Sequence, residues 1–398
     1  MPTSSPATSA SSLSRALTLL HLGGVSRRSE LTARLGLTRT ATGTVLRELE
    51  QLGLVVTRTG GRPGARTGRP SHGVEIGPQA PMVVAVQVGV ETVRVAEAEL
   101  GGVLGPVTEL PLPDPPAPDA VLGLVVDRVR MVLDRVTRPC AGVGVALPCA
   151  VGTDGSALAA HHLYWPRSVP TRTVLVGLLA SLGHGGLPLT VANDANLAAL
   201  SEFRHGAGRG AQNLLLLMTG QQGVGGGMVI EGRPYTGSAG LALEVGHIPV
   251  GTDRLCHCGN AGCLEAETDP RALLEAVGGR GAGRTLTAAR EVVAAGATDP
   301  AARSAVSKIT DRLGSGLASL VNVLNPDRIV LGGLYADLLR ASEMQLRAGL
   351  AYRSFLDHAG AVDLRPAALP HPALVGAAEV ALQPLLDDPR RAAMTRPA

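Results

Sequence analysis

The sequence lacks the features of a membrane or secreted protein. Among its 398 residues, no uninterrupted apolar run approaches the ~18 residues that a membrane span requires, and no charged-then-apolar signal pattern opens the chain. Lysine occurs once, at Lys308, so arginine supplies almost all of the positive charge. We therefore expect a soluble, cytoplasmic protein that is long enough for two or three domains with their own cores.

Cysteine is scarce as well, and an odd total of five means that not all can pair. Cys256, Cys258 and Cys263 stand close together, which in a cytoplasmic chain favours a metal site over a disulfide. With His247 they form the pattern H-x8-C-x-C-x4-C, and three thiolates with one imidazole are a closed, structural ligand set for tetrahedral Zn²⁺. His257 is a competing ligand, but between two cysteines its side chain should point away. The alternative is a group of unpaired, reactive cysteines.

Positive charge is concentrated at the amino-terminal end. Residues 1–77 hold ten arginines and four acidic residues, a balance of +6 in a chain whose formal net charge is +3, which leaves −3 for the remainder. A basic module on a mildly acidic body is typical of contact with nucleic acid through one end. On charge alone, a solvated arginine-rich face explains the same distribution equally well.

The chain divides into segments of different pattern. Residues 1–12 are small and polar, and we expect a disordered lead-in there. Residues 13–77 combine helical periodicity with a Gly- and Arg-rich stretch. From 81 to 385, short apolar runs alternate with Ala- and Leu-rich helical runs, which predicts an α/β domain. Residues 386–398 should form a loose tail. The expected buried strands are 82–90, 143–151, 214–218 and 328–333.

Residues 26–51 have the pattern of two short helices joined by a tight turn. Ser26 is the expected cap of the first helix, and Gly36 allows the turn. Thr38 should cap the second helix, which runs from residue 39 to about residue 51. This is the arrangement of a helix-turn-helix, in which the second helix enters the major groove of DNA.

We expect the second helix and the stretch after it to contact DNA. Arg39, Thr40 and Thr42 fall in the first turns, where a recognition helix meets base edges, whereas Arg47 lies nearer to phosphates. The Gly-rich stretch that follows should form a hairpin, or wing, that reaches phosphates or the minor groove through Arg58, Arg62, Arg66 and Arg69. Residues 13–77 are therefore interpreted as an α+β winged helix-turn-helix. The alternative is a small protein-docking module.

Three motifs in the larger segment are specific. They read VANDANLAALSE (191–202), GSAGLALEVGHIPV (237–250) and CHCGNAGCLE (256–265). Through them the chain resembles, over nearly its whole length, the ROK family of repressors and sugar kinases, in the subgroup with an amino-terminal winged helix-turn-helix. The resemblance implies an actin- or hexokinase-like α/β domain with a ligand cleft between two lobes. Lobe 1 would span about 81–191 plus the carboxy-terminal helix, and lobe 2 about 192–368.

The resemblance also implies which residues hold a sugar in the cleft. They are Asn193, Asp194, Glu244, His247 and Glu265, whose amide, carboxylate and imidazole groups can bond neighbouring hydroxyls. His247 would give one ring nitrogen to Zn²⁺ and the other to the sugar, so that the metal fixes its tautomer. In kinase relatives, the residue matching Asp194 is the general base that takes the proton of the attacking hydroxyl. The structural alternative for Asp194 is a cap on the helix that follows.

One loop departs from the pattern of the family's kinases, which carry D-x-G-G-T where Mg²⁺ and the phosphates of ATP bind. Here the sequence reads Gln87, Val88, Gly89, Val90, Glu91. Gln87 removes the anionic metal anchor, and Val90 puts a branched side chain where the backbone approaches phosphate. Glu91 adds a negative charge beside a polyanion, which repels it. These changes argue against catalysis.

Other positions also differ from the family's pattern. Gln221 and Gln222 interrupt the second glycine-rich loop, although the general-base position and the glycines that follow persist. On the sugar side, Cys149 and Leu243 stand where glycine is usual, and His162 stands where asparagine is common. These departures predict a reshaped pocket that can admit a ligand other than plain glucose, and they leave open which sugar or derivative binds.

The sequence thus predicts a sugar-responsive transcriptional regulator, a repressor, that binds sugar without phosphorylating it. As a homodimer or homotetramer it should bind a palindromic double-stranded operator. Two alternatives stay open. One is a bifunctional sugar kinase with a fused DNA-binding domain. The other is a regulatory docking protein whose body binds a transporter or enzyme component in place of sugar.

Overall fold

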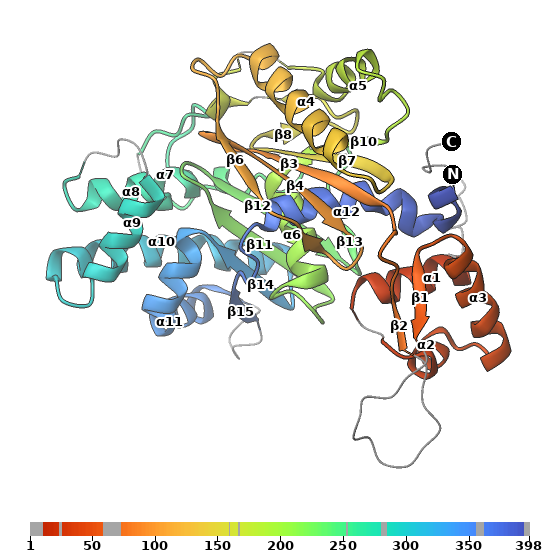
Figure 1. Ribbon diagram of the computed structural model, residues 1–398. Coiled ribbons are helices and arrows are strands. Elements are labelled where there is room, and N and C mark those ends of the chain that lie inside the picture. Colours follow the sequence, from red (N-terminus) through yellow and green to blue (C-terminus); the bar gives the residue numbers. More distant parts are fainter. Residues whose placement is uncertain are drawn as a thin grey trace, which may run out of the picture.

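The computed structural model shows a small amino-terminal module beside a larger body of two α/β lobes (Figure 1). It describes residues 11–23, 26–58, 73–158, 160–165, 168–251, 254–279, 285–355 and 362–393. The predicted wing residues Arg62, Arg66 and Arg69 lie outside these ranges. Within them, no helix combines the length and the apolar character needed to cross a membrane.

The amino-terminal module packs three helices against a two-stranded antiparallel sheet. Its elements are α1 (Ser12–His21), α2 (Arg28–Leu35), α3 (Arg39–Gln51), β1 (Val55–Arg58) and β2 (Gly73–Ile76). Gly36 is left-handed with φ 66°, and the Thr38 hydroxyl accepts a hydrogen bond from the Ala41 N–H at 3.2 Å, so the predicted turn and cap are confirmed. The predicted cap at Ser26 is wrong, because Arg27 occupies the N-cap and forms no side-chain cap bond.

The first lobe is built on a sheet with the strand order β10-β7-β3-β4-β5, and β6 pairs with β4. Because side chains alternate along a strand, Met82, Val84 and Val86 pack against the helices on one face, and Val83 and Ala85 pack on the other. Its strands are β3 (Met82–Val88), β4 (Thr92–Glu99), β5 (Val103–Leu104), β6 (Thr108–Pro111), β7 (Cys140–Leu147) and β10 (Leu189–Asn193). The helices that cover it are α4 (Pro118–Arg135) and α5 (Thr171–Ser181), and a hairpin follows β7, formed by β8 (Ala150–Val151) and β9 (Ala157–Leu158).

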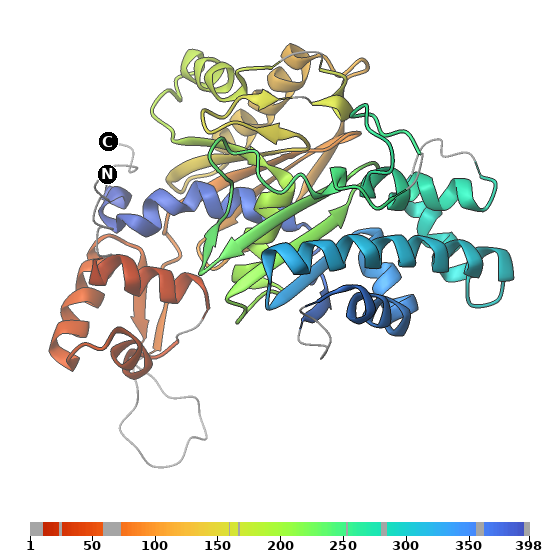
Figure 2. The same cartoon turned by 180° about the vertical axis from the view of Figure 1, so that it is seen from behind.

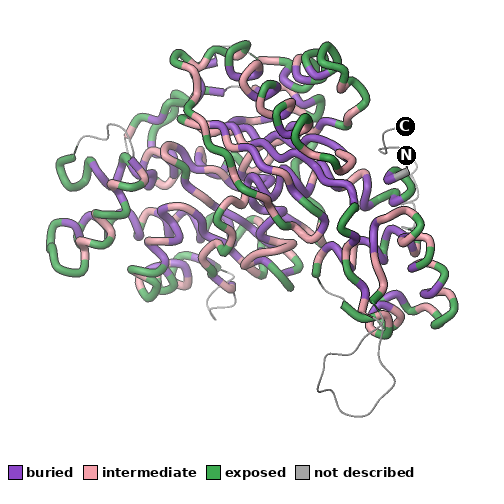
Figure 3. The backbone as a smooth tube through the Cα atoms, viewed as in Figure 1, coloured by how far each residue is buried: buried purple, intermediate pink, exposed green. Residues whose placement is uncertain are grey.

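The second lobe is a sheet with the strand order β13-β12-β11-β14-β15. Leu215 and Leu217 on its central strand pack against a helical layer, and the central strands of both sheets are buried (Figure 3). The strands are β11 (Asn213–Thr219), β12 (Val224–Ile230), β13 (Arg233–Pro234), β14 (Arg328–Gly332) and β15 (Asp363–Pro366). The helices of this layer are α7 (Leu264–Thr268), α8 (Pro270–Ala276), α9 (Thr285–Ala295), α10 (Pro300–Leu324) and α11 (Leu334–Arg353).

Two further helices lie between the sheets and join the lobes (Figure 2). α12 (Pro372–Asp387) packs on β3 and β7 of the first sheet, whereas α6 (Asp194–His205) packs on β11 and β12 of the second. The two helices also pack so closely on each other that a Cβ at Gly376 would collide with the carbonyl oxygen of Leu197. A relative movement of the lobes must therefore pass through this helix pair.

Two predicted boundaries are wrong. The lead-in was expected to reach residue 12, but Ser11 caps α1 and Ser12 is its first residue, while 1–10 lie outside the described residues. The loose tail was expected from residue 386, but α12 continues to Asp387 and the 3-10 helix η3 (Pro389–Ala393) follows it. Ala392 is buried and η3 contacts both α12 and α1, so this stretch is held by packing that the sequence pattern does not reveal.

Candidate functional site

A cavity of about 440 Å³ lies between the lobes. It is lined by all the residues predicted to hold sugar: Asn193, Asp194, Glu244, His247 and Glu265. They come from three separate places in the chain, namely the junction of β10 with α6, the 3-10 turn η2 (Val245–His247) and helix α7. The structure therefore collects polar groups that can bond a polyhydroxylated ligand at one place.

Asn193 and Asp194 are positioned by the junction of β10 and α6. The Asn193 side chain accepts a hydrogen bond from the Asn196 N–H at 3.0 Å and donates one to the Cys149 carbonyl at 3.0 Å. Asn193 is therefore the cap of α6, and the proposed capping role for Asp194 is wrong. Burial, together with the nearby charge of Glu244, raises the pKa of Asp194 to about 7. Its carboxyl group can thus accept or hold a proton near neutral pH.

The two glutamates are held by different means. Glu244 follows Leu243, a non-glycine residue in the left-handed region with φ 69°, which is a strained conformation where the family usually has glycine. Burial raises the pKa of Glu244 above its usual value. The Glu265 carboxylate accepts a hydrogen bond from the Val224 N–H at 2.9 Å, which ties α7 to the start of β12. Burial raises the pKa of Glu265 as well.

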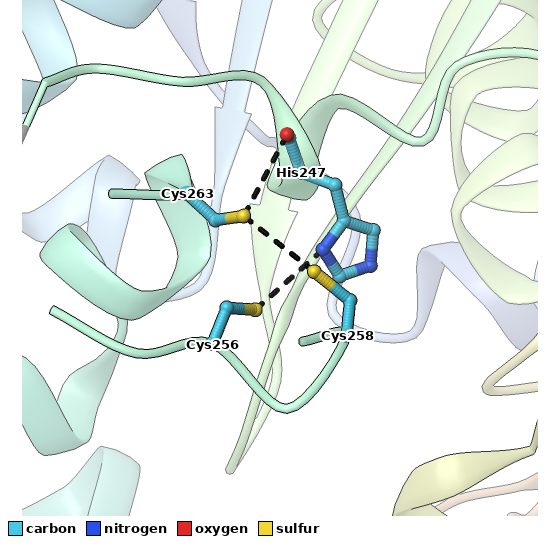
Figure 4. Close-up of side chains that lie close together, drawn as sticks. All are labelled: His247, Cys256, Cys258 and Cys263. Atoms are coloured by element: carbon cyan, nitrogen blue, oxygen red, sulfur yellow. Dashed lines mark hydrogen bonds between the residues drawn. The ribbon is translucent and has the colours of Figure 1, made fainter. Parts of the chain in front are cut away.

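His247 and the three clustered cysteines meet beside the cavity (Figure 4). Nδ1 of His247 lies 3.7 Å from Sγ of Cys256, and the Sγ atoms of Cys258 and Cys263 are 3.7 Å apart. All four ligand atoms lie within 4.8 Å of one another. A tetrahedral site with Zn–S bonds of ~2.3 Å separates its ligand atoms by ~3.8 Å, close to these two distances, so the four residues suit Zn²⁺ in kind and in spacing.

The loop that carries the cysteines closes through backbone turns. Gly259 and Gly262 have φ of 92° and 73°, which only glycine adopts readily, and the Cys256 N–H donates to the Asn260 carbonyl at 2.8 Å. Cys263 then leads into α7. With Nδ1 of His247 on the metal side, its Nε2 is the nitrogen left for a ligand in the cavity.

Two further histidines, His162 and His257, lie beside Glu265 and were not predicted to be part of the sugar site. Nδ1 of His257 lies 2.8 Å from the Glu265 carboxylate and 3.9 Å from Sγ of Cys256, so the expectation that its side chain points away from the cysteines is wrong. The group of mutually close ligand atoms is nevertheless that of His247 and the three cysteines. The rings of His162 and His257 pack at 5.0 Å between centroids. Burial lowers the pKa of His162 to about 4, so the ring is neutral and offers one donor and one acceptor. The histidine at position 162, where the family commonly has asparagine, was the sequence feature that could have identified this residue as part of the site.

The loop after β3 forms the part of the cavity where, by the family resemblance, kinases hold phosphates. The Gly89 N–H donates to the Thr92 carbonyl at 2.8 Å, so it is already used in closing the turn. Glu91 is exposed there. Arg94 is bound through two hydrogen bonds of 3.0 Å to Glu109, whose pKa they lower, and this pairing neutralises the guanidinium. This end of the cavity presents carboxylates rather than a cradle for a polyanion.

The second loop is closed in a different way. Gln221 lies before β12, and its side-chain oxygen accepts a hydrogen bond from the Leu286 N–H at 2.9 Å. Its backbone carbonyl accepts another from the Thr285 hydroxyl. Both partners belong to the first turn of α9, so the end of the helix that would attract an anion is occupied by the protein itself.

The exposed face of α3 differs from the prediction at one position. Arg39, Thr40 and Arg47 are exposed as expected of groups that contact DNA. Thr42 is fully buried and its hydroxyl bonds a backbone carbonyl of the helix at 3.0 Å, so its predicted contact with base edges is wrong. Thr44 is exposed instead and accepts a hydrogen bond from Arg47 at 3.1 Å. Its spacing of four residues from Thr40 was the signal that could have identified it.

Neighbouring arginines support this face. The Arg28 guanidinium donates to the Arg39 carbonyl at 3.0 Å and thereby holds the start of α3 against α2. Arg58 lies on the hairpin and pairs with Glu75 at 2.9 Å, with both side chains largely exposed. Such an exposed pair contributes about 0–1 kcal/mol, so Arg58 can readily exchange its partner for a phosphate.

Comparison with known proteins places the larger domain in a group with two kinds of activity. Residues 83–383 match the ROK family. The chain is 30% identical over 299 residues to a glucokinase of Streptomyces coelicolor, covering 69% of this chain and 89% of that protein. It is also 30% identical over 229 residues to the xylose repressor of Caldicellulosiruptor bescii, covering 54% of this chain and 55% of that one.

Among solved structures, one similar chain is described as a ROK family transcriptional regulator, a homologue of the E. coli Mlc protein. It superposes with a TM-score of 0.74 at 24% identity, covering 94% of this chain and 96% of that one. The fold is therefore shared across the amino-terminal module as well as the two lobes. The chain spans about half the length of the first curated relatives that it matches.

Proposed function

The chain belongs to the ROK family, and we propose that it is a DNA-binding transcriptional repressor whose two-lobed domain binds a sugar without phosphorylating it. The relatives include repressors and kinases, so membership alone does not choose between them. The observation that carries the proposal is that a helix-turn-helix with an exposed basic face and a sugar-type cleft are built into one chain.

The cleft residues suit a neutral, polyhydroxylated ligand. Asn193, Asp194, Glu244 and Glu265 can accept or donate hydrogen bonds to adjacent hydroxyls, and the neutral ring of His162 adds a further donor and acceptor. When bound, Zn²⁺ would hold Nδ1 of His247 together with the three cysteines and act as a structural support rather than a reactant. The protein's own part is to aim Nε2 of His247 at the ligand.

The two phosphate-side loops support binding without transfer. Gln87 and Glu91 replace groups that would attract Mg²⁺ and phosphate, and the Gln221 side chain binds the first turn of α9.

One observation favours the second candidate, a sugar kinase. Asp194 has a pKa of about 7 and could therefore take a proton from a sugar hydroxyl. We interpret Asp194 as a group that hydrogen-bonds the ligand, and we attribute its raised pKa to burial.

For the amino-terminal module we propose contact with a palindromic operator. Arg39, Thr40 and Thr44 would face base edges, and Arg47 and Arg58 would face phosphates. A two-fold oligomer would set two such helices about one turn of DNA apart, ~34 Å. A homodimer or homotetramer is therefore part of the proposal.

The test is an electrophoretic shift with DNA from upstream of the protein's own gene, with and without D-glucose, D-xylose or N-acetyl-D-galactosamine. These sugars are the kinds named for the glucokinase, xylose-repressor and N-acetylgalactosamine-kinase relatives. We expect a shift that one of them changes. Absence of any shift at moderate salt would reject a DNA-binding role, and sugar turnover with Mg·ATP would favour the kinase.

A further inference from the structure

A buried cluster joins the amino-terminal module to the two lobes. The Glu379 carboxylate on α12 is fully buried. One of its oxygens lies 3.0 Å from Nε2 of His21 and 2.7 Å from the Arg204 guanidinium, and the other lies 2.9 Å from Nε2 of His205. We call these four residues the Glu379 cluster. They come from α1, α6 and α12.

The cluster is complete as it stands. The Gly101 N–H donates to Nδ1 of His21 at 2.9 Å, so Nε2 of His21 carries the hydrogen that it donates to Glu379. Burial raises the pKa of Glu379, but the hydrogen bonds from His205 and His21 and the charge of Arg204 outweigh it and lower the pKa overall. Although two imidazoles and a carboxylate can bind a metal, here every nitrogen that faces Glu379 already donates to it.

The end of α1 touches both lobes. His21 receives the Gly101 N–H from the turn between β4 and β5 of the first lobe. The next residue, Leu22, offers its carbonyl to the Arg209 guanidinium at 3.4 Å, and Arg209 precedes the first strand of the second lobe. A movement of one lobe against the other must therefore change the bonds at the end of α1.

The cluster lies at the opposite end of α6 from the cleft. α6 begins with Asp194 and is capped by Asn193, both of which line the cavity, and it ends with Arg204 and His205. A helix of this length, 12 residues, spans ~18 Å, so one continuous element links the cleft to the cluster. A ligand at the first turn of α6 therefore contacts the same helix that carries Arg204 and His205 to Glu379 on α12.

We propose that the Glu379 cluster is the joint that transmits closure of the cleft to the amino-terminal module. Sugar binding shifts α6 against α12, the bonds that Arg204 and His205 form with Glu379 change, and His21 carries the change into α1. The inference rests on the proposed function, since it needs both a ligand in the cleft and DNA at the module.

The test compares operator affinity with and without sugar in His21→Leu, which removes the link between α1 and the cluster. The probes are the upstream DNA duplex and whichever of D-glucose, D-xylose and N-acetyl-D-galactosamine alters DNA binding by the unchanged protein. Arg390→Ala is the matched control, because it removes an exposed 2.9 Å pair with Glu48 of α3 that joins the same two parts of the chain outside the cluster.

Coupling between two sites typically amounts to about 5- to 150-fold in affinity, and we expect the unchanged protein to fall in this range. In His21→Leu the sugar should still bind with unchanged Kd, while its effect on operator affinity falls below about twofold. Arg390→Ala should keep the full effect. If sugar changes the operator affinity of His21→Leu as much as that of the unchanged protein, the proposed role of the Glu379 cluster is wrong.

Because His21 is buried, amide hydrogen exchange of the unchanged protein provides a second test that needs no variant. Sugar should change the exchange of the Gly101 amide and of the last turn of α1, and identical exchange with and without sugar contradicts the joint. If no sugar binds or alters DNA binding at all, the proposed function fails first. If coupling is present but insensitive to His21, only the joint fails.

Discussion

The side-chain oxygen of Gln221 accepts a hydrogen bond from the backbone N–H of Leu286 at 2.9 Å. The first turn of α9, with its unpaired N–H groups, would otherwise attract an anion. The side-chain amide of Gln221 therefore occupies the position beside the cleft where a phosphate would otherwise bind. Glu91 lines the same cavity, is exposed, and repels a polyanion.

From this arrangement we expect no phosphorylation of D-glucose or D-xylose with Mg·ATP in a coupled assay that detects ADP release. The double variant Gln87→Asp, Glu91→Thr restores the metal anchor and removes a repelling charge, and it should bind Mg·ATP more tightly than the parent. Glu99→Thr is a suitable control, because Glu99 is an acidic residue of the same lobe outside the cavity. Steady ATP turnover by the unchanged protein would contradict this account of the loops.

Zinc should be retained by the purified protein at about one ion per chain, since the four ligands are complete. Cys263→Ser should lose the metal, lower the melting temperature and weaken sugar binding, because His247 is then no longer aimed. Native mass spectrometry gives the metal content. Cys140→Ser, outside the metal set, should keep zinc, and a Cys263→Ser protein with full metal content would show that the site is elsewhere.

Glu265→Gln should weaken sugar binding by about 10- to 100-fold, because a hydrogen bond to a charged group contributes about 1.5–3 kcal/mol. Isothermal calorimetry measures the change. Glu275→Gln is the control, since Glu275 forms an exposed pair with Arg254 and does not line the cavity between the lobes. Equal sugar affinities for the two variants would show that Glu265 does not contact the sugar.

Asp194 should make stability depend on pH. Its pKa in the folded protein is about 7, above the usual 3.8, so the folded chain binds more protons than the unfolded chain between these values. The contribution of this group to the free energy of unfolding therefore decreases as the pH rises from about 4 to 7, and it stays low at higher pH. Asp194→Asn should raise the melting temperature at about pH 8 and have little effect at about pH 4. A constant difference at both pH values would contradict the raised pKa.

Arg47→Ala should weaken DNA binding roughly equally for specific and unrelated sequences, and it should reduce the slope of log affinity against log salt by about one. Arg347→Ala removes a similar exposed arginine from α11, in the second lobe, and should change neither quantity. Fluorescence anisotropy over a range of salt concentrations measures both. An unchanged slope in Arg47→Ala would place this residue away from phosphate.

Much of the fold follows from local signals in the sequence. The tight turn at Gly36 and the cap at Thr38 depend on backbone conformations that few residues allow, so they could be predicted. The spacing of His247 and the cysteines likewise fixed a ligand set that the structure brings together. The lobes followed from the family motifs rather than from periodicity.

The remaining features depend on contacts between distant segments. Thr42 was misassigned because it is polar, although it stands four and seven residues before Leu46 and Leu49, the spacing of one buried helix face. His162 and His257 meet at Glu265 only after the lobes assemble. His21 and Glu379 are 358 residues apart, and no local pattern marks either one as buried.

The central claim is that the cleft binds a sugar and passes the event to DNA without consuming ATP. The most direct measurement is the anisotropy of a labelled duplex from upstream of the gene, titrated with protein at fixed salt, with and without D-glucose, D-xylose or N-acetyl-D-galactosamine and with no nucleotide present. We expect one sugar to change the operator Kd by about fivefold or more. An operator Kd that no sugar changes, or a change that requires Mg·ATP, would contradict the claim.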